Sequence, residues 1–415
     1  MTQTRKHWRY LQSNVSSRLE ELRNEMVSSM LGMIPLKGIG PENGGDGELR
    51  KAQYLQRLME GMGFDVERID SEDARVPSGL RPNLVVRYPG RLSRSIWVIS
   101  HMDVVPPGSG WDSDPFSPLV KEGRIYGRGT EDNGQAIISS IYALKAIQEL
   151  ELKPELGLSL AIVSDEETGS EHGIKHLLSQ GIFSSGDMAL VPDAGNSEGT
   201  MVEVAEKGIL WLRLRVKGKQ AHASTPNRGI NANRVAMKLA LAIDDLLHCK
   251  FSKENKLFDP PRSTFEPTKR ELNVENINTI PGEDVTHFDC RVLPDYDLDE
   301  VLSTVRSICG TFEGYGVEVE LSVVGRSEPS FTDPGSDIVE RLRRVIRVLR
   351  GKEAFPMGIG GGTCASHLRR AGIQTAVWMT TDETAHQPNE YCIIRNLVED
   401  AKVIAALPIQ DLAGD

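Results

Sequence analysis

Long apolar runs are missing from this sequence. None of its apolar segments approaches the roughly eighteen residues that a membrane-spanning helix needs. Residues 1–18 are polar and charged, and they contain no apolar core of the length found in signal peptides. We therefore expect a cytoplasmic protein with no membrane partner.

Cysteine is scarce and widely spaced. The chain has five cysteines among 415 residues and no Cys-x-x-Cys pair. An odd number at such spacings supports neither a disulfide framework nor a zinc site built from thiolates. We expect reduced side chains, mostly in the core, at Cys249, Cys290, Cys309, Cys364 and Cys392.

A surplus of positive charge is also absent. The formal net charge is −11, which argues against nucleic acid or an anionic membrane as a partner. Hydrophobic residues make up 39% of the chain and charged residues 26%, as is typical of a globular protein. The length allows about two to three domains, and we find no internal repeat and no low-complexity tract.

An acidic pair follows one of the apolar segments. Residues 158–163 are typical of a buried strand, and Glu166 and Glu167 come just after it. Two ionised carboxylates held together repel each other unless a cation or a proton lies between them. Adjacent side chains diverge in an extended or tightly turned backbone, so one glutamate can hold a metal while the other accepts a proton from metal-bound water. A solvated acidic loop is the alternative interpretation of this stretch.

A histidine follows a second short apolar strand, residues 96–99. His101 lies beyond the carboxyl end of that strand, where open α/β sheets bind their ligands. Asp103 lies on the same side of an extended chain and can hydrogen-bond the other ring nitrogen, as the partners of metal-binding histidines do. A surface His-x-Asp pair is the alternative.

Two aspartates occupy comparable positions. Asp193 follows a third apolar strand, residues 188–191. Asp132 follows a glycine-rich turn and precedes a predicted helix, residues 136–150, whose terminal amides can orient a carboxylate. Capping that helix is the alternative role for Asp132.

Strands and helices alternate through the first half of the chain, which favours an α/β domain with a largely parallel sheet. From about residue 206 the order changes to βαββαβ, the split βαβ pattern. We therefore predict an α/β domain formed by residues 1–205 and 328–415, with an inserted ferredoxin-like domain, residues 206–327. The predicted strands of the insert are residues 209–216, 272–280, 285–293 and 317–324, and its helices are residues 231–247 and 298–308.

Together, the candidate residues offer imidazole and carboxylate groups without thiolates. This chemistry suits zinc, and also cobalt or manganese. The set exceeds the three protein ligands that one catalytic zinc needs, and it fits two metals about 3.5–4 Å apart with a bridging carboxylate. Its members are His101, Asp132, Glu166, Glu167, Asp193 and His386.

The order of these residues resembles a known family. This family is the co-catalytic zinc amidohydrolases, which include acetylornithine deacetylase, succinyl-diaminopimelate desuccinylase, aminoacylase, carboxypeptidase G and several dipeptidases. Six motifs occur in the family's order: Ser100-His101-Met102-Asp103; Trp111 with Asp114-Pro115-Phe116; Gly127-Arg128-Gly129-x-x-Asp132; Asp165-Glu166-Glu167-x-Gly169; Gly218-x-x-Ala221-His222-x-x-x-Pro226; and His386-x-Pro388-Asn389-Glu390.

The resemblance implies a role for each candidate in a metal-binding catalytic domain. Asp103 would steer the ring of His101. Glu166 would be the general base that deprotonates the bridging water and later protonates the leaving amine, a task that a carboxylate beside metal-bound water can perform. The metal ligands would be His101 and Asp193 for one ion, Glu167 and His386 for the other, and Asp132 between both.

The resemblance also makes the inserted domain a lid and dimerisation module. His222 would reach the active site of the partner subunit and stabilise the tetrahedral oxyanion. Asn278 and Arg291 would hold the carboxylate of the substrate, a task that suits the planar fork of arginine. Gly361 and Gly362 match a glycine loop near the substrate; a phosphate cradle is the competing interpretation, but no Lys-Ser/Thr pair follows it. Plain surface positions are the alternative for His222 and Arg291.

The implied activity is hydrolysis of the amide bond of an N-acyl amino acid by a homodimer with two divalent metals per chain. A dipeptidase or carboxypeptidase acts on the same amide beside a carboxylate, so the motifs do not separate these activities. A non-catalytic small-molecule binder on the same fold would have lost the base or a ligand, whereas this sequence keeps Glu166 and all five ligands.

The sequence departs from the family's commoner pattern at two points. Asn133-Gly134-Gln135 follows Asp132, where many members have Lys-Gly one residue further on. Asp193 stands where many deacylases have Glu, which shortens that ligand by one methylene. Asp is familiar there in dipeptidase-like members, so this departure loosens the assignment of the substrate and leaves the metal ligands unchanged.

Overall fold

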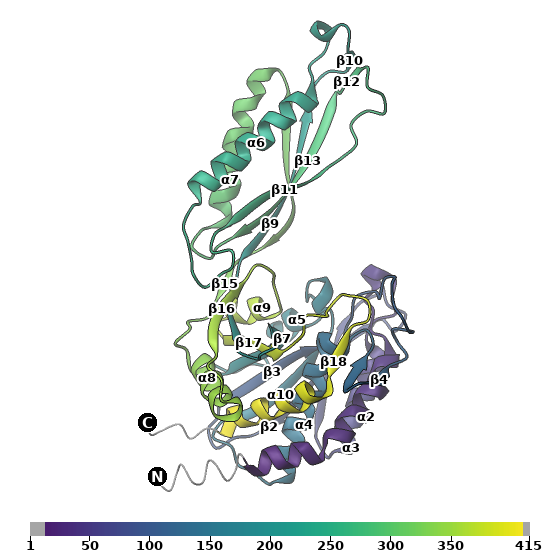
Figure 1. Ribbon diagram of the computed structural model, residues 1–415, viewed down its shortest axis with the longest axis vertical. Helices are drawn as coiled ribbons and strands as arrows, with labels where there is room; N and C mark the ends of the chain where they lie inside the picture. Colours follow the sequence, from purple (N-terminus) through teal and green to yellow (C-terminus); the bar gives the residue numbers. More distant parts are fainter. Residues whose placement is uncertain (1–12, 410–415) are drawn as a thin grey trace. The chain divides into compact units, whose positions relative to one another are not determined.

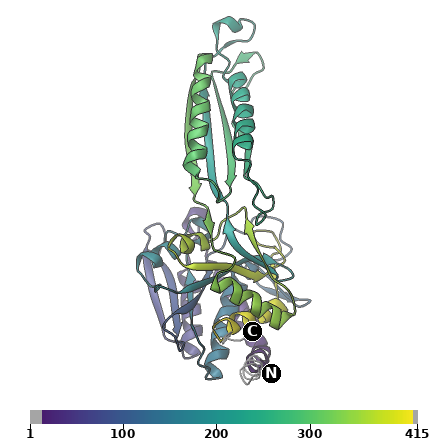
Figure 2. The ribbon, with the colours of Figure 1, turned by 90° about the vertical axis from the view of Figure 1, so that its left-hand side faces the viewer.

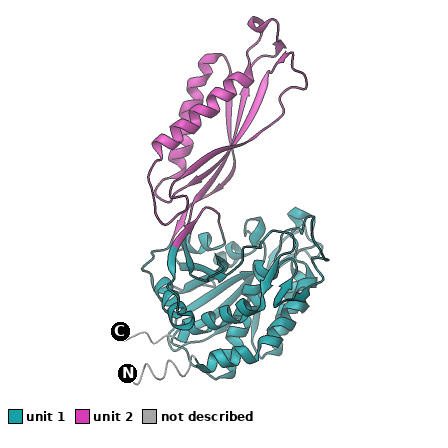
Figure 3. Cartoon of the chain, viewed as in Figure 1, with its two compact units in different colours: residues 1–204, 332–356, 363–415 teal, residues 205–331, 357–362 magenta. Residues whose placement is uncertain are grey.

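The computed structural model describes residues 13–409, which form two compact units (Figure 3). Within this range, unit 1 comprises residues 13–204, 332–356 and 363–409, and unit 2 comprises residues 205–331 and 357–362. Along the sequence, unit 2 is therefore inserted into unit 1.

The largest sheet has nine strands and carries the core of unit 1 (Figure 1). Strand β6 is buried along its whole length, because a central strand is covered on both faces. In spatial order the strands are β1 (Val66–Glu72), β2 (Leu80–Tyr88), β6 (Gly157–Val163), β3 (Ser95–His101), β7 (Met188–Asn196), β17 (Gln374–Thr380), β8 (Met201–Glu206) and β15 (Ser330–Phe331), with β16 (Phe355–Ile359) also paired to β8.

The mixed α/β class is confirmed, but the sheet is parallel only at its centre. Strands β6, β3, β7 and β17 are parallel neighbours. Strand β2 pairs with both β1 and β6 in antiparallel fashion, and β8 pairs antiparallel with β17. The expectation of a largely parallel sheet was therefore too broad, because alternation of strands and helices does not reveal the direction of the outer strands.

Helices and a small sheet complete unit 1. Helix α4 (Ala136–Glu149) is almost entirely buried and contacts α2 (Arg23–Met33) and α10 (Ile394–Ala406). Residues 13–21 are also helical. The other helices are α3 (Leu49–Gly61), α5 (Ile174–Ser179), α8 (Asp337–Arg350) and α9 (Ala365–Arg370), and the small sheet contains β4 (Leu119–Lys121), β5 (Arg124–Tyr126) and β18 (Tyr391–Ile393).

Unit 2 is a four-stranded antiparallel sheet with two helices on one face. Figure 2 shows the helices side by side along the strands. Alternate residues of β9 face the helices, so Leu210, Leu212, Leu214 and Val216 lie in the core, while the residues between them lie on the other face. The elements are β9 (Gly208–Lys217), α6 (Ala232–Lys250), β11 (Thr264–Arg270), β13 (Glu283–Val292), α7 (Leu298–Phe312) and β14 (Glu318–Ser327), and the sheet order is β11-β13-β9-β14.

The strand predicted over residues 272–280 is wrong. Only Thr279–Ile280 (β12) is extended, in a short pair with Ala221–His222 (β10), while the side chains of Leu272 and Ile277 are 85% and 103% exposed. The second strand of the sheet is instead β11, which contains Pro267. Proline is tolerated there because β11 is an edge strand and its register shifts between Pro267 and Lys269.

Residues 13–409 contain all five cysteines. All five cysteines are free thiols, and four of them are buried, as expected; Cys249 is exposed. In this part of the chain no helix is both long enough and apolar enough to cross a membrane.

Candidate metal centre

The carboxyl ends of three parallel strands meet at one edge of the central sheet, as predicted. His101 ends β3, the Glu166–Glu167 pair follows β6, and Asp193 lies in β7. Asp132 lies in the turn η3 (Thr130–Gln135), and His386 lies in the loop between β17 and β18.

These side chains lie within a few ångströms of one another. His101 Nε2 is 2.9 Å from Asp132 Oδ1 and 3.5 Å from Asp193 Oδ1. His386 Nε2 is 3.1 Å from Asp132 Oδ2 and 3.1 Å from Glu167 Oε2. The carboxylate of Asp132 therefore presents one oxygen to each histidine. His101 and Asp193 also form a close group with Glu166.

The site concentrates negative charge in a largely buried place. Burial, with the nearby Asp193 carboxylate, raises the pKa of Glu166 well above its usual range. Contacts with Asp132 and Glu167 raise the pKa of His386 to about 10. Burial lowers the pKa of His101, but its carboxylate neighbours outweigh that effect and raise it well above normal. A glutamate that favours its protonated form and histidines that favour their charged form both indicate a place that stabilises cations.

The donor atoms fit divalent metal ions. Around a tetrahedral zinc with bonds of about 2.0–2.1 Å, neighbouring ligand atoms lie roughly 3.3 Å apart. The separations of 2.9–3.5 Å from the two histidines to the carboxylates match this spacing. Imidazole nitrogen and carboxylate oxygen are ligands for zinc, cobalt or manganese.

Asp103 contacts more than the ring of His101. Its Oδ1 is 3.4 Å from His101 Nδ1, and its backbone carbonyl is 3.1 Å from the same nitrogen. In addition, the Asp103 carboxylate accepts the backbone N–H groups of Glu166 at 3.1 Å and Glu167 at 2.9 Å. It thus links the histidine to the turn that carries both glutamates.

Asn133 also belongs to the site, although the sequence analysis noted it only as a departure from the family's pattern and gave it no role. Its Oδ1 accepts the backbone N–H of His101 at 3.2 Å, and its Nδ2 donates to Asp193 Oδ1 at 3.0 Å and to the carbonyl of Pro192 at 2.7 Å. Asn133 therefore orients two candidate ligands. Its position directly after Asp132 was the signal that could have found it.

Glu390 also belongs to the site, although the motif that contains it suggested no role. Its buried carboxylate accepts the backbone N–H groups of Gly129, Glu131 and Asp132 at 2.9–3.1 Å and pairs with Arg128 at 2.6 Å. Burial raises the pKa of Glu390 to about 7. These contacts fix the backbone that carries Asp132.

A buried arginine supports the turn before the glutamates. The guanidinium of Arg81 pairs with both oxygens of Glu48 at 2.7 and 2.5 Å and lies 3.5 Å from Asp165 Oδ1. Asp165 adopts a left-handed backbone, with φ of 64°, immediately before Glu166. The ion pairs among Arg81, Glu48 and Asp165 therefore stabilise a left-handed backbone conformation, which costs an L-residue free energy.

The substrate-binding candidates and His222 all lie in unit 2, in two groups; Gly361 and Gly362 belong to this unit although they follow the predicted insert, residues 206–327. His222 and Asn278 are both exposed. They lie near each other because Ala223, next to His222, donates its N–H to the carbonyl of Asn278 at 2.9 Å. Arg291 donates to both oxygens of Asp289 at 2.6 and 2.9 Å and to the carbonyl of Gly360 at 2.9 Å. Gly361 and Gly362, which follow Gly360, are exposed.

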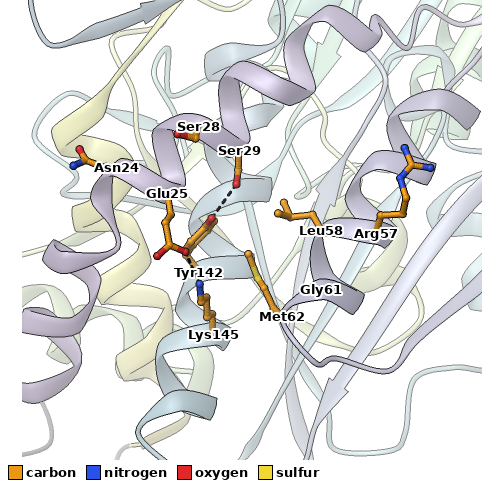
Figure 4. A pocket seen from close by; sticks show the side chains of 10 residues that line it. All are labelled: Asn24, Glu25, Ser28, Ser29, Arg57, Leu58, Gly61, Met62, Tyr142 and Lys145. Atoms are coloured by element: carbon orange, nitrogen blue, oxygen red, sulfur yellow. Dashed lines mark hydrogen bonds and ion pairs between the residues drawn. The ribbon is translucent and has the colours of Figure 1, made fainter.

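A separate hollow of about 560 Å³ lies among α2, α3 and α4 (Figure 4). Four of its polar side chains form two pairs: Lys145 Nζ donates to Glu25 at 2.5 Å, and the hydroxyls of Tyr142 and Ser29 are 2.9 Å apart. It contains none of the candidate ligands.

Comparison with known proteins gives the family. Residues 97–410 match the model of Peptidase family M20/M25/M40. The chain belongs to this family. The matched range contains all six candidates of the metal centre, and as an M20 metallohydrolase the protein is an enzyme.

The M20 chain has relatives of known and unknown activity. An uncharacterised metallohydrolase of Methanocaldococcus jannaschii is 40% identical over 403 residues, which cover 92% of this chain and 98% of the relative. Succinyl-diaminopimelate desuccinylase of Nitratiruptor sp. is 29% identical over 295 residues, covering 70% and 77%. The crystal structure of aminopeptidase PepT from Bacillus cereus shares the fold, with a TM-score of 0.76 at 20% identity and coverage of 93% and 98%.

Proposed function

We propose that this M20 metallohydrolase cleaves the amide bond of N-acyl amino acids with two divalent metal ions per chain. The observation that carries the proposal is the carboxylate of Asp132, which presents one oxygen toward His101 and the other toward His386. A bridging carboxylate between two ligand groups is what a two-metal site needs.

The ligand groups follow from these contacts. Asp193 completes the group of His101, and Glu167 completes the group of His386. The bound ions would polarise the amide carbonyl and lower the pKa of a bound water toward 7. Glu166 lies beside His101 and Asp193 and would accept the proton of that water and pass it to the leaving amine.

The N-acyl amino acid class is supported by the desuccinylase relatives. The competing activity is that of a dipeptidase or carboxypeptidase. The presence of Asp193, where many deacylases have Glu, favours this second activity. Both substrate classes carry a carboxylate next to the amide. Arg291 would receive that carboxylate through its guanidinium, in exchange for part of its pairing with Asp289.

A hydrolysis screen tests the substrate class. The purified protein is incubated with acetylornithine, succinyl-diaminopimelate, other N-acyl amino acids and dipeptides, each with zinc, cobalt or manganese, and the released amine is measured. We expect metal-dependent release from at least one N-acyl amino acid at a higher kcat/KM than from any dipeptide. Cleavage of dipeptides alone would replace the proposal by its competitor, and no cleavage of either class would contradict both.

We further propose that the working unit is a homodimer joined through unit 2. Strands β11 and β14 are the edges of its sheet, and the exposed apolar side chains of Val323 and Val324 lie in β14. An exposed apolar edge is a surface that a second copy can cover. His222, also exposed, would act in the neighbour's site as a donor to the oxyanion, a contribution worth roughly 2.7–4 kcal/mol.

Mixing two inactive variants tests the shared site. Glu166→Gln and His222→Ala are combined under conditions that exchange subunits, and activity is measured with exchange followed by mass spectrometry. If His222 acts across the dimer, one site per mixed dimer combines an intact Glu166 with an intact His222, and activity returns. No return despite demonstrated exchange, or a fully active monomer, would rule out the shared site.

A further inference from the structure

Glu131 is adjacent to Asp132, but its carboxylate binds a different segment, the loop that carries His386. Glu131 Oε1 accepts the backbone N–H of Asp382 at 2.8 Å. Its Oε2 accepts the hydroxyl of Thr384 at 2.8 Å and also the backbone N–H of that residue. Glu131 is only 3% exposed, so these bonds have no competition from bulk water.

The loop that receives Glu131 needs such support. It connects β17 to β18 without regular structure, and Glu383, His386 and Asn389 all have left-handed backbones, with φ of 60–63°. The side chain of His386 is 55% exposed. Neighbouring side chains therefore do not enclose this histidine, and its position depends on how the backbone of its loop is held.

The contact is reciprocal. Glu390, at the end of the same loop, accepts the N–H groups of Glu131 and Asp132, while Glu131 accepts those of Asp382 and Thr384. Two buried carboxylates, those of Glu131 and Glu390, thus connect the turn of Asp132 to the loop of His386 by hydrogen bonds. Each fixes the backbone of the segment that the other comes from.

We propose that Glu131 is a positioning residue for His386, and that it sets the affinity of the metal site formed by Glu167 and His386. This inference rests on the two-metal function proposed above. Glu131 would not touch the metal or the substrate. It would act through the backbone of residues 382–384, and its loss would weaken one of the two metal sites more than the other.

The test is metal titration of the Glu131→Gln variant by calorimetry, after chelation, with zinc or cobalt. Glutamine keeps the shape but has one acceptor oxygen, so its amide nitrogen would face a backbone N–H. Loss of an outer partner of a metal ligand typically costs about 10–100-fold in affinity. We expect one of two binding steps to weaken by that factor, the other to stay, and activity to recover at high metal concentration. Thr384→Val, which removes one donor to Glu131, should shift the same step less.

Asp187→Asn is the matched control. Asp187 is also a buried carboxylate that accepts backbone N–H groups, from Ser95 at 2.7 Å and Ser184 at 2.8 Å, but Ser95 begins β3 whereas His101 ends it. This control should lose stability without changing either metal affinity. Unchanged metal affinities in Glu131→Gln, or an equal loss of metal affinity in Asp187→Asn, would overturn this inference and leave the proposed two-metal function standing. A wild-type protein that binds no metal would contradict the proposed function as well.

Discussion

Replacing Glu166 by Gln should reduce kcat by about 10²–10⁴-fold while metal content and KM stay near their wild-type values. The amide has nearly the same shape as the carboxylate but cannot accept a proton. Glu166 is suited to that task because its carboxylate lies beside His101 and Asp193, and because burial and Asp193 raise its pKa well above the usual range.

The control for this variant is Glu171→Gln. Glu171 lies five residues further along the chain, is exposed, and pairs with Lys175 at 2.5 Å. Its replacement should leave kcat unchanged. The measurement is steady-state kinetics on the substrate found in the screen, with metal content determined on the same samples. A near-normal kcat in Glu166→Gln would remove this residue from the role of base.

The sequence predicted the strand ends well because their signal is local. A short apolar run followed at once by His101, by Glu166 or by Asp193 marks both the buried strand and the polar group at its end. The structure brings these residues together because the three strands are parallel neighbours. Asp132 and His386 were proposed from their motifs, and in the structure each lies within 3.1 Å of another candidate ligand.

Interactions over long sequence distances were beyond sequence reasoning. Glu131 contacts residues about 250 positions away, and nothing in its neighbourhood indicates that its carboxylate is buried. Arg81 reaches Asp165 in the same way, across 84 positions. Such side chains look like solvated charges in a sequence, and only the fold shows that they are enclosed and paired.

The failed strand has a physical explanation. Leu272 and Ile277 lie in the predicted strand, but both are exposed, while the true strand β11 contains a proline and three charged residues among seven. An edge strand needs few apolar side chains and tolerates proline at a bulge.

Helix α10 was also not predicted.

The largest expected effect is that of metal removal. The cluster holds four carboxylates and two histidines within a few ångströms, and the proposed chemistry needs ions both to polarise the amide and to acidify the water. Chelation should therefore abolish hydrolysis of every substrate. It should leave the fold of unit 2 unchanged, because none of the candidate ligands belongs to that unit.

Metal back-titration of the chelated protein tests the central claim most directly. Zinc, cobalt or manganese is added in known equivalents, and bound metal and hydrolysis are measured together. We predict no activity without metal and full activity once about two ions are bound per chain, as a site bridged by Asp132 requires. Full activity in protein shown to be free of metal would contradict the account.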